Sequence, residues 1–390
     1  MLTHSYYEED PRVRREAESL VAAGRPVDVF ALRRPGDTAD GEVDGVRLHR
    51  LDVQRHQGAS LPVYIREYLD FFVRASLALV QAEPRRRYAL VQVHTLPDFL
   101  AFAALPLRLA GVPVLLDLHE AMPEFFRSRF PGAANPLAYR LLLLQERLSI
   151  AAASHAITVN DALGRRLVGL GVPADKVSVV INSPSLVRFD PARHERRAFA
   201  QDGTLRLVYA GALTPTYELD VAVQAVARLR ETRPELPVVL NVYGRGDSEP
   251  ALRAQADRLG LDGGVVFHGR IPIEEVPAAI AAADIGLAPT RRDEFTDVSL
   301  STKIFEYGAM DKPAVASRLP LVERTFEPGT VATYEPGEPA ALADAILRIA
   351  DDPAEREAAV GRTAARIRDL AWEREAERYV ALVDRLAKGR

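Results

Sequence analysis

VSLSTKIFEYGAMDKPAVAS, residues 298–317, runs from a polar turn into a short helical pattern and then an apolar strand. Ser299, Ser301 and Thr302 are residue types that cap helices, and a helix beginning there directs unpaired backbone N–H groups and the positive end of its dipole at an anion. Thr302 and Lys303 lie four and three positions before Glu306, so the three side chains share one arc. The stretch therefore predicts a phosphate and sugar site, and the alternative is a surface helix with one Lys–Glu pair.

Apolar strand patterns alternate with helical patterns through both halves of the chain. The first half has strand patterns at 26–32, 88–94, 112–118, 156–160 and 177–182. After a polar, turn-rich stretch at 188–203, the second half has strand patterns at 205–211, 237–243, 265–269, 284–289, 313–317 and 331–335. Near-continuous apolar strands joined by helices are typical of parallel sheets covered on both faces. The sequence thus predicts an α/β protein with two doubly wound domains.

The composition narrows the class of function. The 390 residues carry a formal net charge of −4, without the basic excess needed to wrap a nucleic acid, and they include no cysteine for disulfides, thiolate nucleophiles or zinc. No signal-type leader or membrane-length apolar run occurs, so we expect a cytoplasmic protein. Amphipathic segments beside Arg85, Arg86 and Arg87 leave open a peripheral contact with the inner face of the membrane, although a solvated turn also fits.

Ligands of open parallel sheets bind beyond the carboxyl ends of the strands, so the loops there hold the candidate residues. Gly244 and Gly246 follow a strand, but Glu249 stands where a dinucleotide fingerprint needs its third glycine, and the pair fits either close approach to a ligand or an ordinary turn. No Walker sequence, Gly-x-Ser-x-Gly elbow or pair of histidines at helical ligand spacing occurs. The sequence therefore predicts a site without a metal or a cofactor.

A nucleoside diphosphate bound without a metal needs cations from the protein. Lys303 and Arg270 are candidates, and Arg291 and Arg292 are further ones that also fit a solvated surface. His119 follows a strand at the edge where a histidine can donate to a substrate oxygen, and a structural histidine bonded to a neighbouring carbonyl is equally compatible with its position.

Several stretches resemble the retaining GT-B glycosyltransferases of the glycosyltransferase family 4 type. Those resembling the donor domain are YAGALTPTYELDVAVQAV (209–226), LNVYGRGDSEPALRAQADRLG (240–260), VVFHGRIPIEEVPAAIAAADIGLAP (265–289) and LSTKIFEYGAMDKPAVAS (300–317). VHTLPDFLAFAA (93–104) and LDLHEAMPEF (116–125) resemble the acceptor domain of bacterial polysaccharide-type members. The resemblance implies a GT-B fold with an acceptor-binding domain at 1–192, a donor-binding domain at 193–371, and a last helix, about 372–390, that crosses back to the first domain.

The resemblance also implies an activity: a retaining, metal-independent transfer of a hexose from a nucleotide diphosphate sugar, with a UDP-sugar favoured over a GDP-sugar. The acceptor would be the hydroxyl of a sugar, a lipid-linked molecule or a small molecule, as in polysaccharide biosynthesis. His119 would orient the donor sugar, Glu306 would bind the ribose, and Lys303 the pyrophosphate. Arg270 and Ile271 would contact the edge of the base. The other donor-binding residues that the resemblance implies are Gly211, Asp297, Ser301 and Thr302.

Three positions depart from the family pattern. Val298 stands where the first of two glutamates is usual, and Ala212 and Tyr217 replace an arginine and a lysine of the donor loop. Lys303 and Arg270 must then carry more of the diphosphate charge, because a buried charge with too few partners is costly. These departures favour one alternative, a non-catalytic GT-B scaffold or partner subunit. A GT-B sugar-nucleotide epimerase is a second alternative, although the sequence shows no acid and base carboxylates for it.

Overall fold

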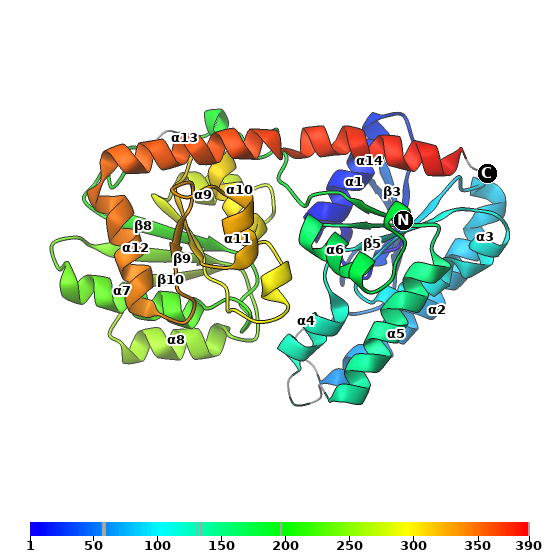
Figure 1. Ribbon diagram of the computed structural model, residues 1–390, viewed down its shortest axis with the longest axis horizontal. Helices are drawn as coiled ribbons and strands as arrows, with labels where there is room; N and C mark the ends of the chain where they lie inside the picture. The colour runs from blue at the N-terminus through cyan, green and yellow to red at the C-terminus, as the bar shows by residue number, and fades with distance from the viewer. Residues whose placement is uncertain (57–59, 131, 133–134, 196, 389–390) are drawn as a thin grey trace. The chain divides into compact units, whose positions relative to one another are not determined.

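The computed structural model describes residues 1–56, 60–130, 132, 135–195 and 197–388. The chain divides into two compact units. Unit 1 comprises Met1–Asn182 and Trp372–Arg390, of which residues 389 and 390 lie outside the described part, and unit 2 comprises Ser183–Ala371. Each unit is a layered α/β structure around a largely parallel sheet (Figure 1). The predicted fold class is therefore confirmed.

Unit 1 is built on two strand groups that Leu2 connects. The strands are β1 (Asp28–Leu32), β2 (Asp40–Val43), β3 (Val46–Leu51), β4 (Val91–His94), β5 (Val114–Leu118), β6 (His155–Thr158) and β7 (Val177–Val179). They are ordered β1-β3-β2 and β4-β5-β6-β7, and Leu2 pairs in parallel with both Phe30 and Val93. Every pair is parallel except β2 with β3, a polar hairpin that the strand patterns did not predict.

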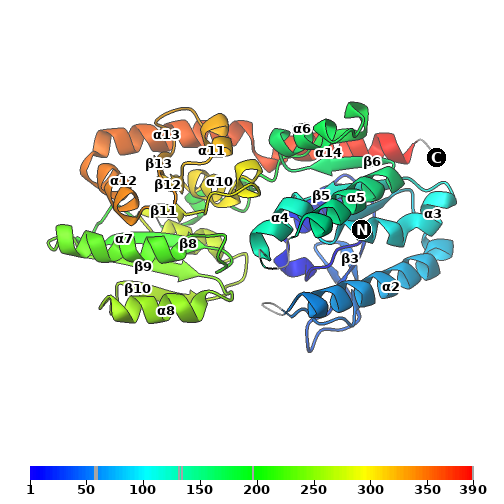
Figure 2. The same cartoon turned by 60° about the horizontal axis from the view of Figure 1, so that its bottom comes forward.

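Helices cover both faces of the sheet of unit 1. They are α1 (Pro11–Ala22), α2 (Leu61–Arg86), α3 (Leu105–Leu109), α4 (Met122–Arg129), α5 (Pro136–Ala152), α6 (Asp161–Gly169) and α14 (Trp372–Ala387), with 3-10 helices η1 (Tyr7–Glu9), η2 (Asp98–Ala104) and η3 (Ala174–Lys176). One apolar core lies under α2, η2, α3 and α5, and a second lies under α1 and α14. Figure 2 shows α2, α3 and α5 in unit 1 from below. Asp10 caps α1 through a 3.2 Å bond from the Val13 N–H, and Pro11 occupies the first turn.

Unit 2 holds a six-stranded parallel sheet in the order β10-β9-β8-β11-β12-β13. The strands are β8 (Leu205–Ala210), β9 (Val238–Tyr243), β10 (Val265–Gly269), β11 (Ile285–Ala288), β12 (Ala314–Ser317) and β13 (Ala332–Tyr334). The helices are α7 (Leu219–Thr232), α8 (Glu249–Arg258), α9 (Val276–Ala281), α10 (Thr302–Ala309), α11 (Pro320–Thr325), α12 (Pro339–Asp351) and α13 (Pro353–Asp369), with η4 (Pro191–Arg193) and η5 (Thr296–Val298). The neighbours α7 and α12 share one core, whereas α10 belongs to a second (Figure 1).

Helix α10 is held directly against the sheet. The Tyr307 hydroxyl donates to the Leu287 carbonyl at 3.0 Å, and a Cβ on Gly286 would lie 2.2 Å from the Tyr307 ring. On the other side, a Cβ on Gly308 would lie 2.4 Å from a methyl group of Thr363 in α13. These contacts fix where the start of α10 lies. Among the described helices, none is long and apolar enough to cross a membrane.

Candidate active site

Lys303 is the central residue of the predicted donor site. It lies in the first turn of α10, and the residue is only 6% exposed. Its ammonium nitrogen lies 3.9 Å from the ring centroid of Tyr217 and 5.0 Å from that of Tyr209. Within the described chain this ammonium makes no hydrogen bond or ion pair, so two aromatic faces are its electrostatic partners. A buried cation in this state favours an anionic ligand.

Gly211, which follows β8, provides the space that the Lys303 side chain occupies. A Cβ at Gly211 would lie 2.5 Å from Cε of Lys303, and the backbone there has a φ of +156°. The glycine loop after β9 packs on the same segment, because a Cβ on Gly244 would lie 1.8 Å from the Gly211 carbonyl oxygen. Gly246 is placed in the same way against Leu213. Gly244 and Gly246 thus allow these loops to pack closely on each other.

The N-terminus of α10 has unused hydrogen-bonding capacity. Ser301 occupies the N-cap position, as predicted, but its hydroxyl makes no capping bond. The Ser301 Oγ atom is buried without a hydrogen-bond partner among the described residues. Thr302 is the first helical residue and Glu306 lies one turn later, both partly buried. Ser301, the N–H groups of the first turn and Lys303 therefore form one region suited to an anion.

The other predicted donor residues are not all in direct contact with Lys303. Arg270 and Ile271 follow β10, which is the edge strand and lies two strands from β8, on the order of 10 Å across the sheet. Asp297 lies in η5, where its Oδ1 accepts a 3.3 Å hydrogen bond from Nε of Arg292. Arg292, one of the candidate cations, is thus already paired with a carboxylate. The structure brings together Gly211, Ser301, Thr302 and Lys303.

In unit 1, His119 belongs to a charged cluster beyond the end of β5. Its Nε2 lies 2.9 Å from Oδ2 of Asp117, which is fully buried in the strand. Arg12 of α1 donates from Nε and Nη2 to the two carboxylate oxygens of Asp117 at 2.9 and 2.7 Å. Burial opposes a charge on His119, but the Asp117 carboxylate outweighs it, so the pKa of His119 lies above its ordinary value. Nδ1 is the ring nitrogen left for a substrate oxygen.

His94, Asp117 and His119 are the described residues whose ligand atoms lie close enough together to hold a metal ion, within 4.8 Å. His94 Nδ1 lies 3.0 Å from Oδ2 of Asp117. Arg12, however, already neutralises both oxygens of that carboxylate, and a fixed guanidinium there repels a second cation. The cluster does not favour a metal, and a metal-independent reaction stays a prediction.

The same cluster continues to the last helix of the chain. Gln92 of β4 donates from Nε2 to Glu16 of α1 at 2.5 Å, and Tyr379 of α14 donates to Gln92 at 2.5 Å. Glu16 is completely buried beside Arg12. Burial and the nearby Asp117 carboxylate raise the pKa of Glu16 to about 8. Buried hydrogen bonds and the Arg12–Glu16 ion pair thus connect α14 to Asp117 in β5, the strand that precedes His119.

Of this cluster, only His119 was predicted from the sequence as a functional residue. Asp117 is a carboxylate inside an otherwise apolar strand pattern, and Arg12 and Glu16 are opposite charges four apart in a helix that follows a strand end. A buried strand rarely contains an aspartate without a partner, so Asp117 was the available signal. Asp98 was missed as well: it is fully buried, neither carboxyl oxygen has a partner among the described residues, and burial raises its pKa well above the ordinary value.

Comparisons with known proteins agree with this architecture. A family model described as a glycosyl transferase 4-like domain matches residues 10–183, and one described as glycosyl transferases group 1 matches residues 204–352. The D-inositol 3-phosphate glycosyltransferase of Pseudarthrobacter chlorophenolicus is 26% identical over 389 residues, covering 96% of this chain and 90% of the relative.

Two solved structures share the whole fold. Sucrose-phosphate synthase from Thermosynechococcus elongatus has a TM-score of 0.79 at 19% identity, covering 99% of this chain and 98% of that one. Anabaena HepE in complex with UDP-glucose has a TM-score of 0.72 at 15% identity, covering 98% of each chain. Two glycosyltransferase domains in tandem, each on a parallel-sheet unit, together span most of the sequence. The chain is therefore a glycosyltransferase with the GT-B fold.

Proposed function

We propose that this protein transfers a hexose from a nucleotide diphosphate sugar to an acceptor hydroxyl, with retention of the anomeric configuration and without a metal. The observation that carries the proposal is the ammonium of Lys303, a buried cation whose described partners are two tyrosine rings. A diphosphate bound there gains a charge-assisted contact in a region of low dielectric. Ser301 and the N-terminus of α10 add donors for the phosphate oxygens.

The remaining donor contacts are assigned from the family resemblance, supported by the position of these residues after strands of the unit 2 sheet. Glu306, one turn beyond Lys303, binds the ribose hydroxyls, and Asp297 contributes to the sugar. Arg270 and Ile271, after the edge strand, contact the base. We favour a UDP-sugar, supported by the UDP-glucose complex of Anabaena HepE, whose fold this chain shares. The relative named as an inositol phosphate glycosyltransferase supports a hydroxyl acceptor on a polar small molecule or sugar, with a lipid-linked acceptor as a further class.

His119 and Lys303 fit a mechanism that retains the anomeric configuration without a protein nucleophile. The acceptor attacks on the face from which the leaving diphosphate departs, and the diphosphate takes the acceptor proton. His119, charged through its contact with Asp117, donates a hydrogen bond that orients the donor sugar. Lys303 stabilises the negative charge that grows on the leaving diphosphate.

The experiment that tests this proposal needs no known acceptor. The purified protein is incubated with a panel of UDP-, GDP-, dTDP- and ADP-sugars, and nucleoside diphosphate released by slow hydrolysis is measured with and without EDTA. We expect release from one nucleotide class, unchanged by EDTA. Proton NMR of the released sugar at early times then reports its anomeric configuration, and an inverted product would refute retention.

A non-catalytic scaffold is the second candidate, and the replacement of a donor-loop lysine by Tyr217 is the observation that favours it. In that case the Tyr217–Lys303 contact would be purely structural. A thermal-shift assay with the same nucleotides separates the two, because a ligand that binds only the folded state raises Tm. A scaffold would show neither a Tm shift nor nucleotide release.

A further inference from the structure

Helix α2 presents a row of apolar side chains to solvent. Ile65, Leu69, Val73 and Leu77 are spaced by four residues, so they line one face of the helix, and each is about half exposed. Single exposed leucines are ordinary on a protein surface, but a continuous apolar row along a helix of 26 residues marks an interaction surface.

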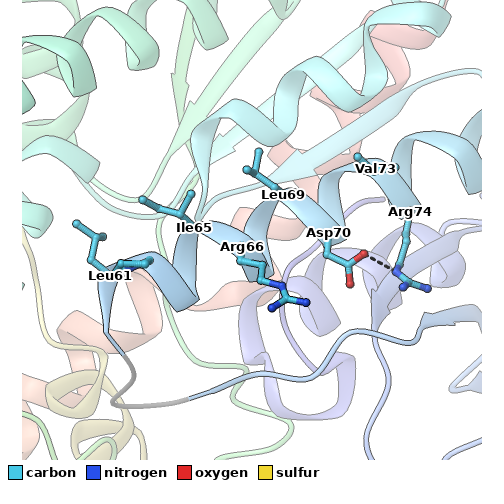
Figure 3. A pocket seen from close by; sticks show the side chains of 8 residues that line it. Leu61, Ile65, Arg66, Leu69, Asp70, Val73 and Arg74 are labelled. Carbon is cyan, nitrogen blue, oxygen red and sulfur yellow. Dashed lines mark hydrogen bonds and ion pairs between the residues drawn. The ribbon is translucent and has the colours of Figure 1, made fainter.

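The outer surface of α2 is itself amphipathic. Figure 3 shows Ile65 and Leu69 projecting on one side of the helix and Arg66, Asp70 and Arg74 on the other. Side chains of both kinds line one open hollow. Asp70 accepts a 2.7 Å hydrogen bond from Nε of Arg74, so its charge is matched within the same helix. The Asp70–Arg74 pair is therefore neutral as a whole, and the positive charge that borders the apolar row on this stretch is that of Arg66.

A second apolar row lies on α5. Leu137, Leu141, Leu144 and Leu148 follow a spacing of four, three and four residues, which places them on one face, and each is more than half exposed. Both α2 and α5 pack against η2 on the same face of the unit 1 sheet. The two rows thus belong to one surface, which we call the α2–α5 face.

The fold does not require these outer rows. α2 is anchored by Phe71, Ala75 and Leu79, which are buried on its opposite side, and α5 is anchored by Ile150. Replacing an outer leucine by a polar residue of similar size therefore leaves the core unchanged. The apolar residues of the α2–α5 face are available for another molecule.

The charges of this face are mainly positive, although the whole chain has a formal net charge of −4. Exposed arginines lie along or at the end of both helices: Arg66, Arg85, Arg87, Arg140 and Arg147. Two further exposed arginines are already paired, Arg74 with Asp70 and Arg86 with the buried Asp28. Among the acidic residues of the two helices, Glu67 and Glu146 are buried beneath them, where they contact His4 and Arg166. Asp70 is paired with Arg74, and Glu83 is half-buried near the end of α2. A face that combines leucine rows with arginine borders matches an apolar layer under negative headgroups.

We propose that the α2–α5 face binds the surface of an anionic lipid bilayer. If two copies of this face packed together, the arginines of one copy would lie near those of the other. The repulsion between these like charges disfavours a second copy as the occupant. A bilayer accepts the leucine rows at the acyl boundary while the arginines reach the headgroups. This inference goes beyond the donor chemistry and does not depend on it, so its failure would leave the proposed transfer reaction untouched.

Vesicle co-sedimentation of the full chain tests the proposal. Vesicles of phosphatidylcholine alone are compared with vesicles of phosphatidylcholine and phosphatidylglycerol in equal parts, at low and high salt. We expect strong binding to the anionic vesicles, weakened by salt. The double variant Leu69→Gln/Leu141→Gln should lower the partition coefficient by about tenfold or more. The matched control is Leu259→Gln, an exposed leucine of unit 2, which should bind like wild type.

Two results would overturn the proposal. Equal or absent binding to both vesicle types would exclude an anionic bilayer. A dimer in sedimentation velocity without lipid that Leu69→Gln/Leu141→Gln dissociates would instead assign the face to a second copy. Folding is checked by thermal unfolding followed through the fluorescence of Trp372, the single tryptophan. Trp372 is buried in the core of unit 1 under α1 and α14, whereas both variant positions lie on α2 and α5.

Discussion

The ammonium of Lys303 lies over the ring of Tyr217, with Nζ 3.9 Å from the ring centroid. The position where the family pattern has a lysine thus holds an aromatic ring that contacts the remaining lysine of the site. An aromatic face holds a cation without neutralising it. The contact keeps Lys303 in place while leaving its charge for a ligand.

Tyr217→Leu should therefore weaken donor binding by about 3- to 10-fold, because the lost cation–π contact lets the Lys303 side chain move. Tyr217→Phe is the matched control, since it keeps the ring and should bind within about twofold of wild type. Isothermal titration calorimetry with the nucleotide identified in the panel measures both. Equal losses in the two variants would show that the hydroxyl, not the ring, is what matters.

Gly211→Ala should displace Lys303 rather than unfold unit 2. The new Cβ would meet Cε of Lys303, the flexible end of a side chain, so the lysine can yield. We expect donor affinity to fall about tenfold, with a stability cost of about 1–3 kcal/mol from the backbone strain. Gly260→Ala is the control: φ is +63° there and a Cβ would meet nothing within 4 Å. Unchanged donor affinity in Gly211→Ala would contradict the close contact.

His119→Ala should lower kcat by about a hundredfold while donor affinity changes little, because the imidazole acts on the sugar rather than on the diphosphate. Since the pKa of His119 is raised, its charged form persists to higher pH and kcat/KM should fall as pH rises through that pKa. Steady-state rates over a pH series measure this. A kcat within about threefold of wild type would remove His119 from the active site.

The buried Glu16 predicts a pH-dependent stability of unit 1. Its pKa is raised to about 8, so the folded unit holds a proton that the unfolded chain releases near the ordinary value of 4.5. The stabilisation is fully present below about pH 4.5 and is lost as pH rises through about 8, by at most about 1.4 kcal/mol per pH unit. Glu16→Gln, a neutral isostere, should flatten this slope.

Urea unfolding followed by Trp372 fluorescence reports unit 1 alone, because the chain has no other tryptophan. Asp98 and Glu120, whose pKa values are also raised by burial, contribute to the slope of both proteins, so the difference isolates Glu16. Parallel pH profiles for wild type and Glu16→Gln would show that Glu16 is ionised in the folded state.

The sequence was most informative where local patterns suffice. The apolar strand patterns and a helix that begins near Ser301 and Thr302 depend on neighbouring residues, and the structure has both. The Tyr217–Lys303 contact and the bond from Arg12 to Asp117 join segments far apart in the chain, so no spacing rule could find them. Helix α2 escaped prediction because apolar side chains occupy both its inner and outer faces, which hides the helical period.

The most direct test of the central claim is the affinity of wild type and Lys303→Met for the nucleoside diphosphates of the panel, measured by calorimetry. Methionine keeps the length and apolar contacts of the side chain and removes only the charge. The account predicts that wild type binds one nucleotide and that Lys303→Met binds it at least about tenfold more weakly, with an unchanged Tm in the absence of ligand. Equal affinities would place the diphosphate elsewhere and contradict the proposed donor site.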